Sequence, residues 1–373
     1  DSSEFQSFYV DYVIDDVIDR LQSDCGYSYN EARDAIYGGG LRIYTAVDLD
    51  VQKKTENVYV NRKGFEDKKN AQSAITIMDY KGRVVAIVGQ AGVKEGNRVL
   101  NRASSSPRSP GSSIKPFMDY GPYFEFNGGT PNDIVLDAPY AYSDGTQIVN
   151  AMRDYKGYIT IKQALSDSRN IPALKIFQQV DKKKIADYVH AFGINYGDNL
   201  YESASIGAFD GVSPLTMSAA YGTYARGGIY IEPYSYTRII YRDNNEAVEK
   251  TYKKERVCSE KTAKYINEIL LYAVKTGKIL GTLEVGKSEV AGKTGTTTIS
   301  KSRTDALGIS EYAIMDSWAC LYSHDYSIAL WYGYDEVTSE YYMLNYDGTL
   351  GRRRIMKKLV KQIISGDKKL LTS

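Results

Sequence analysis

The chain has 373 residues, a formal net charge of +1 at pH 7, and 43% hydrophobic residues. This length is enough for one large domain with a smaller appendage, and the near-neutral charge gives no reason to expect nucleic acid as a partner. No run of about 18 apolar residues predicts a membrane span. The three cysteines lack C-x-x-C spacing, so we expect neither a zinc site nor a disulfide framework, and their odd number leaves at least one free thiol.

Two helices are predicted near the N-terminus. Apolar residues recur at helical spacing from Val10 to Leu21, which predicts an amphipathic helix that ends near Gly26. Ser28, with Glu31 three residues later, is typical of a capping box that opens a second short helix, and the glycines at 38–40 end it.

The remaining elements predict an α+β fold. Residues 74–78 and 83–89 are rich in β-formers and are joined by a predicted turn at 79–82, and three further strands are predicted at 289–297, 316–322 and 326–334. Between them the pattern is helical, at 159–167, 171–179, 182–192, 213–225 and 261–274. Strands at both ends with helices between them predict an antiparallel sheet, assembled from remote segments, flanked by helices and carrying a helical subdomain. Cys320 falls in one of these strands, where we expect it to be buried.

A last helix is predicted near the C-terminus. Basic residues at 352–354, 357, 358 and 361 are interleaved with Ile355, Leu359, Ile363 and Ile364. We interpret this as an apolar stripe that packs on the sheet and a basic face exposed to solvent, with attraction to anionic wall polymers as the alternative.

Three short motifs carry the chemistry: Ser112-Ser113-Ile114-Lys115, Ser168-Arg169-Asn170 and Lys293-Thr294-Gly295. A serine hydroxyl is a poor nucleophile unless a base takes its proton. If a helix starts at Ser112, Lys115 projects from the same face at i+3. Burial beside a second cation, Lys293, would lower the pKa of Lys115 and let it act as that base.

The set of S-x-x-K, a Ser-x-Asn and K-T-G, in this order, resembles that of penicillin-binding proteins and class A β-lactamases. The surrounding sequence resembles the transpeptidase domain of class A (bifunctional) penicillin-binding proteins over residues 40–365. The similar segments are 101–103, 109–117, 168–173, 211–215, 225–228, 291–297, 316–318 and 331–335. The resemblance implies that residues 1–72 are a linker region between a glycosyltransferase and a transpeptidase domain, and that residues 73–365 form the penicillin-binding transpeptidase domain.

The resemblance also implies roles for the motif residues. Ser168 would relay a proton to the leaving amine, and Asn170 would bind the amide of the substrate. Lys293, Thr294 and Thr296 would bind a carboxylate from an edge strand in which Gly295 lets a substrate backbone approach.

The backbone N–H groups of Ser112 and Thr296 would form an oxyanion hole. A shared proton path requires Ser112 Oγ, Lys115 Nζ and Ser168 Oγ to lie within hydrogen-bond reach of one another, about 2.6–3.2 Å and looser without ligand, with Lys293 pointing into the cluster. Asn170 would then line the opposite wall of a groove open at both ends. We expect the side chain of Arg169 to point away from the chemistry.

The implied activity is that of a serine D,D-transpeptidase. It would cross-link peptidoglycan stem peptides through an acyl-enzyme on Ser112, and β-lactams would inhibit it covalently. No cofactor and no metal is implied. A β-lactamase needs a glutamate, usually in an E-x-x-L-N run, that activates the deacylating water; no such run lies between Asn170 and Lys293, and Glu202 and Glu268 lack its context. A D,D-carboxypeptidase and a catalytically silent β-lactam-binding module remain alternatives.

The implied partners are a stem peptide ending in D-alanyl-D-alanine, an acceptor amine, β-lactam antibiotics and a cell-wall synthesis complex. The chain begins with Asp1 rather than Met, which is typical of an excised fragment. We therefore expect this fragment to be soluble and its parent to be anchored, by a segment missing here, at the extracytoplasmic face of the bacterial cell membrane.

Overall fold

The computed structural model describes residues 5–63, 65, 70–241 and 247–370. Its centre is a six-stranded antiparallel sheet with the order β12-β13-β14-β2-β3, in which β15 also pairs with β13. The strands are β2 (Gln72–Asp79), β3 (Val84–Val88), β12 (Ala291–Thr298), β13 (Ala313–Tyr322), β14 (Tyr326–Gly333) and β15 (Met343–Leu344). The predicted strands and the hairpin turn at 79–82 are confirmed, and β12 lies at an edge of the sheet.

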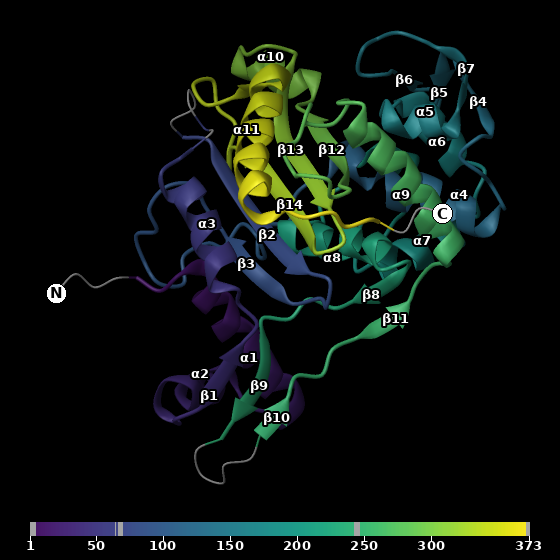
Figure 1. Cartoon of the computed structure of the whole chain (residues 1–373). Helices are drawn as coiled ribbons and strands as arrows, with labels where there is room; N and C mark the ends of the chain where they lie inside the picture. Colours follow the sequence, from purple (N-terminus) through teal and green to yellow (C-terminus); the bar gives the residue numbers. More distant parts are fainter. Residues whose placement is uncertain (1–4, 64, 66–69, 242–246, 371–373) are drawn as a thin grey trace.

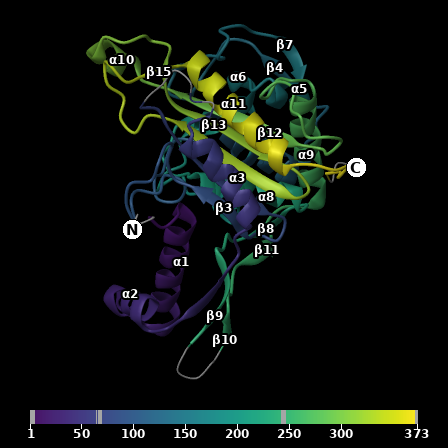
Figure 2. The ribbon, with the colours of Figure 1, turned by 60° about the vertical axis from the view of Figure 1, so that its left-hand side comes forward.

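Both faces of this sheet are buried. Successive residues of β2 alternate between two cores, since Ala74 and Met78 belong to one core and Ile75 and Ile77 to the other. Helices α3 (Leu49–Val60) and α11 (Asn345–Ile363) cover one face, as Figure 2 shows, and helices α8 (Pro214–Ala225) and α9 (Glu260–Lys275) cover the other. Cys320 is buried in β13, as predicted.

The helical subdomain follows β3 and holds the first two motifs (Figure 1). Its helices are η1 (Gly111–Ile114), η2 (Pro116–Tyr120), α4 (Gly121–Phe126), α5 (Ile161–Ser166), α6 (Asn170–Phe177), α7 (Lys182–Ala191) and η3 (Glu202–Ile206). A small β insert precedes α5 and consists of β4 (Ile134–Asp137), β5 (Tyr140–Ala141), β6 (Gln147–Ile148) and β7 (Gly157–Thr160). The predicted helix at 159–167 therefore starts too early, because residues 159 and 160 pair with β4 and the Thr160 side chain caps α5.

A small module lies below the sheet in Figure 1. It contains α1 (Phe8–Cys25), α2 (Tyr29–Gly38) and a three-stranded sheet of β1 (Arg42–Thr45), β9 (Tyr236–Ile240) and β10 (Ala247–Glu249). Asp16 of α1 accepts hydrogen bonds from Ser235 and pairs with Lys250, so remote segments hold the module together. The predicted capping box of Ser28 and Glu31 is present.

The remaining elements are the pair β8 (Ile229–Ile231) and β11 (Lys254–Arg256), and helix α10 (Lys301–Leu307). No helix among the described residues is long and apolar enough to cross a membrane.

Candidate active site

The segment that holds the predicted nucleophile Ser112 is a 3₁₀ turn, and we call residues 111–115 the nucleophile turn. Pro110 precedes η1, and the N–H of Lys115 donates to the carbonyl of Ser112. A 3₁₀ turn has three residues per turn, so Ser112 and Lys115 lie on one face. The turn is anchored through its carbonyl oxygens, which accept from Trp318 Nε1 at Ser109 and from the Tyr221 hydroxyl at Ser113. Ser112 is partly exposed, whereas Lys115 is fully buried.

Two glycines let this turn lie directly against β12. A Cβ at Gly111, whose φ is +51°, would lie 2.5 Å from Thr296 O and 2.9 Å from Thr296 N. A Cβ at Gly295 would lie 2.2 Å from Pro110 O and 2.9 Å from Ser113 N. We expected Gly295 to make room for substrate, but the space beside it is taken by the nucleophile turn. The two glycines therefore bring Ser112 next to Thr296.

The second motif lies at the end of α5. Ser168 has φ +58°, the left-handed conformation that usually selects glycine. The N–H groups of Ser168 and Arg169 donate to Leu165 O and Ala164 O, which is the Schellman pattern of a helix end. This turn directs the carbonyl and the hydroxyl of Ser168 to different lysines.

Lys115 Nζ donates to Ser168 O at 2.8 Å, and Lys293 Nζ donates to Ser168 Oγ at 2.7 Å. The prediction that all three motifs meet is confirmed, and Lys293 points into the cluster. The predicted direct relay is not formed at hydrogen-bond distance: within the described residues no hydrogen bond joins Ser168 Oγ to Lys115 or to Ser112. The reason is the left-handed backbone of Ser168, which presents its carbonyl to Lys115 instead of its hydroxyl.

Asn170 lies beside Lys115 at the start of α6. Its Oδ1 accepts from Lys115 Nζ at 2.8 Å, and its Nδ2 donates to Val149 O. The cause is a capping contact, because Asn150 Oδ1 accepts from the N–H groups of Asn170 and Ile171 at the start of α6. Asn150 was missed by sequence reasoning, since a capping asparagine twenty residues away leaves no local signal.

The guanidinium of Arg169 points away from the lysines, as predicted. It forms a buried ion pair with Asp137 and a second pair with Asp154. Its carbonyl nevertheless accepts a hydrogen bond from Lys115 Nζ at 3.1 Å. Together with Ser168 O and Asn170 Oδ1, it gives the Lys115 ammonium group three oxygen acceptors, one for each N–H. Asp137 and Asp154 were also missed, because isolated aspartates in a loop-rich insert look like ordinary surface residues.

Burial shifts the pKa of three side chains in the cluster, Lys115, Lys293 and Asp119. The pKa of Lys115 is lowered to about 7, mainly by burial; Asp119 opposes this shift and Arg169 adds to it. Burial, Lys115 and Arg352 together hold the pKa of Lys293 well below its usual range. Burial also raises the pKa of the Asp119 carboxyl well above its usual range, while Lys115 opposes that shift. A lysine with these surroundings can lose its proton near neutral pH, which is what a general base requires.

The third motif is contacted by a residue of the last helix that we predicted to face solvent. Thr294 and Thr296 are partly exposed on β12. Arg352 of α11, assigned to a solvent-exposed basic face, is instead buried and donates to Gly295 O and Thr296 Oγ1. The signal was present: Arg352 is three and seven residues from the buried Ile355 and Leu359, so it shares their helix face.

The two glutamates considered for deacylation have partners outside the cluster. Glu202 accepts from Ser143 and from Gln178. Glu268 pairs with Lys162. Neither side chain contacts the motif residues through these bonds.

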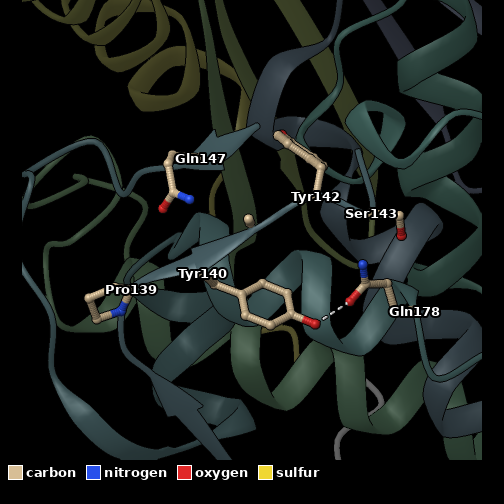
Figure 3. Close-up of a pocket in the computed structure, with 7 residues that line it drawn as sticks. Pro139, Tyr140, Tyr142, Ser143, Gln147 and Gln178 are labelled. Atoms are coloured by element: carbon tan, nitrogen blue, oxygen red, sulfur yellow. Dashed lines mark hydrogen bonds between the residues drawn. The ribbon is translucent and has the colours of Figure 1, made fainter. Parts of the chain in front are cut away.

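An open pocket lies on the β5–β6 hairpin (Figure 3). Its lining includes Tyr140, whose hydroxyl donates to Gln178 Oε1 at 2.7 Å, as well as Tyr142 and Gln147. None of the predicted site residues lines it.

Comparison with known proteins gives one family and consistent relatives. The family described as "Penicillin binding protein transpeptidase domain" matches residues 73–324. Penicillin-binding protein 1A/1B of Bacillus subtilis is 36% identical over 333 residues, which are 88% of this chain and 36% of that protein. Penicillin-binding protein 1A of Clostridium acetobutylicum is 30% identical over 349 residues, which are 87% of this chain and 41% of that protein. The chain therefore spans less than half the length of these relatives.

Solved structures share the fold. PonA1 of Mycobacterium tuberculosis, in complex with penicillin V, has a TM-score of 0.80 at 18% identity and matches 97% of this chain and 95% of its own. Penicillin-binding protein 1A of Haemophilus influenzae has a TM-score of 0.74 at 17% identity and matches 98% of this chain and 72% of its own.

Proposed function

The chain belongs to the penicillin-binding protein transpeptidase family, and we propose that it is a serine D,D-transpeptidase that cross-links peptidoglycan stem peptides through Ser112. The observation that carries the proposal is the convergence of all three motifs on Ser168, whose carbonyl accepts from Lys115 and whose hydroxyl accepts from Lys293. Such an arrangement connects two lysines of lowered pKa to a hydroxyl beside the nucleophile turn.

In the proposed acylation, neutral Lys115 takes the proton of the Ser112 hydroxyl while Ser112 Oγ bonds to the carbonyl carbon of the penultimate D-alanine. The N–H groups of Ser112 and Thr296 hold the resulting oxyanion. When the intermediate collapses, the C–N bond breaks and the amine of the terminal D-alanine takes a proton from the Ser168 hydroxyl, which regains the proton that Lys115 accepted from Ser112, so that Lys115 is neutral again. The terminal D-alanine leaves, and the stem peptide remains as an ester of Ser112.

In the second half, an amine of a neighbouring strand attacks this ester. The Ser112 Oγ–C bond breaks, an amide forms, and the proton lost by the amine returns to Ser112. In this proposal Lys293, Thr294 and Thr296 bind the carboxylate of the departing residue, Asn170 contacts an amide of the stem peptide, and Gly295 shapes the strand. A β-lactam acylates Ser112 in the same way, but its leaving amine stays tethered to the acyl group.

The remaining expectations follow from family membership. We propose that residues 1–72 are a linker region and residues 73–365 the transpeptidase domain, that the parent protein is anchored at the extracytoplasmic face of the cell membrane, and that it works within a cell-wall synthesis complex. The structure of PonA1 with penicillin V supports binding of β-lactams by this fold.

Intact-protein mass spectrometry with and without benzylpenicillin tests the proposal. One molecule of antibiotic should add to the wild type, peptide mapping should place it on Ser112, and Ser112→Ala should fold normally without an adduct. Ser113→Ala, one residue away, serves as the matched control and should still be acylated. An adduct on Ser113 contradicts the assignment.

The fate of the adduct separates the alternatives. Glu202 and Glu268 are engaged elsewhere, so the acyl-enzyme should persist for many minutes to hours. Rapid turnover of a chromogenic cephalosporin would identify a β-lactamase. Release of D-alanine without amide formation when a donor and an acceptor peptide are both supplied would identify a carboxypeptidase, and labelling without any peptide reaction a silent binding module.

A further inference from the structure

Arg352 is a buried cation whose contacts lead to the third motif. Its Nη1 donates to Gly295 O at 2.6 Å and to Thr296 Oγ1 at 2.9 Å, and its Nη2 donates to Thr349 Oγ1. Within the described residues no carboxylate forms an ion pair with it, and its Nε has no hydrogen-bond partner. A buried guanidinium without a counter-ion is costly, so its position calls for an explanation.

The two atoms that accept hydrogen bonds from Arg352 Nη1 belong to adjacent residues, Gly295 and Thr296. The carbonyl of Gly295 and the N–H of Thr296 are the two ends of a single peptide group. A charge-assisted hydrogen bond at the carbonyl end polarises the group and strengthens the N–H as a donor. The nitrogen of this N–H lies beside the nucleophile turn, since Thr296 N is one of the atoms that a Cβ at Gly111 would meet.

The second bond fixes the direction of a hydroxyl. When Thr296 Oγ1 accepts from Arg352, its own proton is left to point elsewhere as a donor. Thr296 is partly exposed, so that proton can face a ligand on β12. The guanidinium itself is held by its burial in α11 and by Thr349, one turn earlier.

We propose that Arg352 is a positioning residue for acylation: it holds and polarises the Gly295–Thr296 peptide, whose N–H stabilises the oxyanion, and it directs the Thr296 hydroxyl toward the carboxylate of the bound ligand. This inference rests on the proposed function, because it assigns a role at the same site. It adds α11, an element outside the three motifs, to the acylation machinery.

The proposal predicts different effects on the rate constant of acylation and on the dissociation constant of the ligand. Polarisation of the peptide acts on the first-order acylation constant, k2, because the oxyanion exists only after attack. The direction of the Thr296 hydroxyl acts on the dissociation constant, Kd, and only for a ligand that carries a carboxylate. Benzylpenicillin and its methyl ester differ in that group alone.

The experiment measures k2 and Kd for both compounds by quenched-flow mass spectrometry in the wild type, Arg352→Met and Arg352→Lys. Removing a whole oxyanion donor costs about 10²–10³ in rate, so loss of its support in Arg352→Met should lower k2 by about 10–30-fold for both compounds. Kd should rise for benzylpenicillin and stay constant for the ester. Arg352→Lys keeps a charged donor and should recover part of k2.

Arg353→Met is the matched control, because Arg353 lies one residue along α11 and its guanidinium approaches Gly281 instead of β12. It should keep both constants. In ¹⁵N-threonine-labelled protein, the amide signal of Thr296 should move upfield in Arg352→Met and partly return in Arg352→Lys, which reports the hydrogen bond even where stability has changed.

Wild-type k2 in Arg352→Met would overturn the proposal, as would a change confined to Kd, an unmoved Thr296 signal, or equal losses in Arg352→Met and Arg353→Met. Failure of the proposed function is recognised separately, since the wild type itself would then form no adduct on Ser112.

Discussion

The two walls of the site are built in opposite ways. On the sheet side, the nucleophile turn lies against β12 because two residues, Gly111 and Gly295, have no side chain. On the helix side, the Ser168 turn is held by hydrogen bonds and charges, which come from Asn150, Arg169 and Asp137. The sheet wall is thus sensitive to added atoms, whereas the helix wall is sensitive to lost polar partners.

Lys115 joins the two walls, so its replacement should have the largest effect. Lys115→Arg should lower the acylation rate nearly as much as Lys115→Ala, up to about 10⁴-fold, because arginine keeps the charge but does not release a proton at accessible pH. Acylation by benzylpenicillin, followed by mass spectrometry, measures both variants. If Lys115→Arg retained most of the rate, Lys115 would have only a charge role.

The sheet wall should tolerate no added methyl group. Gly295→Ala places a Cβ 2.2 Å from Pro110 O and forces the turn away from β12. Acylation should fall by about 10²–10³-fold, as expected when an oxyanion donor is misplaced. Gly38→Ala is the matched control, since a Cβ there meets nothing within 4 Å.

A Gly295→Ala variant that is acylated at the wild-type rate would show that the turn and the strand need not touch, and the contrast between the two walls would fail.

The helix wall should lose stability when a charged partner of Arg169 is removed. Asp137→Asn leaves the buried guanidinium of Arg169 with only the half-exposed Asp154 as a partner. Breaking a buried ion pair costs about 3–5 kcal/mol of folding stability. Because the Arg169–Asp154 pair remains, we expect a loss near the lower end of this range. Because Arg169 O and Ser168 O both bind Lys115, acylation should also fall by about tenfold, a figure we assign from one weakened charged hydrogen bond.

Urea unfolding and acylation rates measure both effects. Asp305→Asn, which removes an exposed partner of Lys301, is the control and should leave stability and acylation unchanged. Equal stability of Asp137→Asn and Asp305→Asn would mean that the Arg169 pair does not support the helix wall.

Local sequence patterns predicted the sheet wall better than the helix wall. The β-formers of β2 and the Lys-Thr-Gly strand are features of neighbouring residues, and both segments were confirmed as strands of the sheet. The insert was not predicted, because strands of two to four residues such as β5 and β6 show too little periodicity. Its residues Asp137 and Asn150 therefore carried no signal, although they hold the second motif.

Two further differences have physical causes that one-dimensional patterns do not contain. Ser168 adopts a left-handed conformation that its residue type does not suggest, so the direction of its carbonyl was not foreseen. Arg352 was assigned to solvent by its charge, although its helix position placed it with Ile355 and Leu359. The helical periodicity therefore indicated the burial of Arg352 better than its charge did.

The last prediction concerns the pH dependence of acylation, which follows from the burial of Lys115 between the two walls. Burial holds the pKa of Lys115 at about 7. The neutral amine is the base, so the acylation rate should rise with pH up to about 7 and level off above it, falling about tenfold for each pH unit below. Asp119 raises the pKa of Lys115, so Asp119→Asn should move the midpoint to lower pH. Rates measured from pH 5 to 9 at saturating benzylpenicillin give both midpoints. A midpoint that moved upward in Asp119→Asn, or a wild-type rate that fell as pH rose through 7, would mean that the titrating group is not Lys115 in the enclosure described.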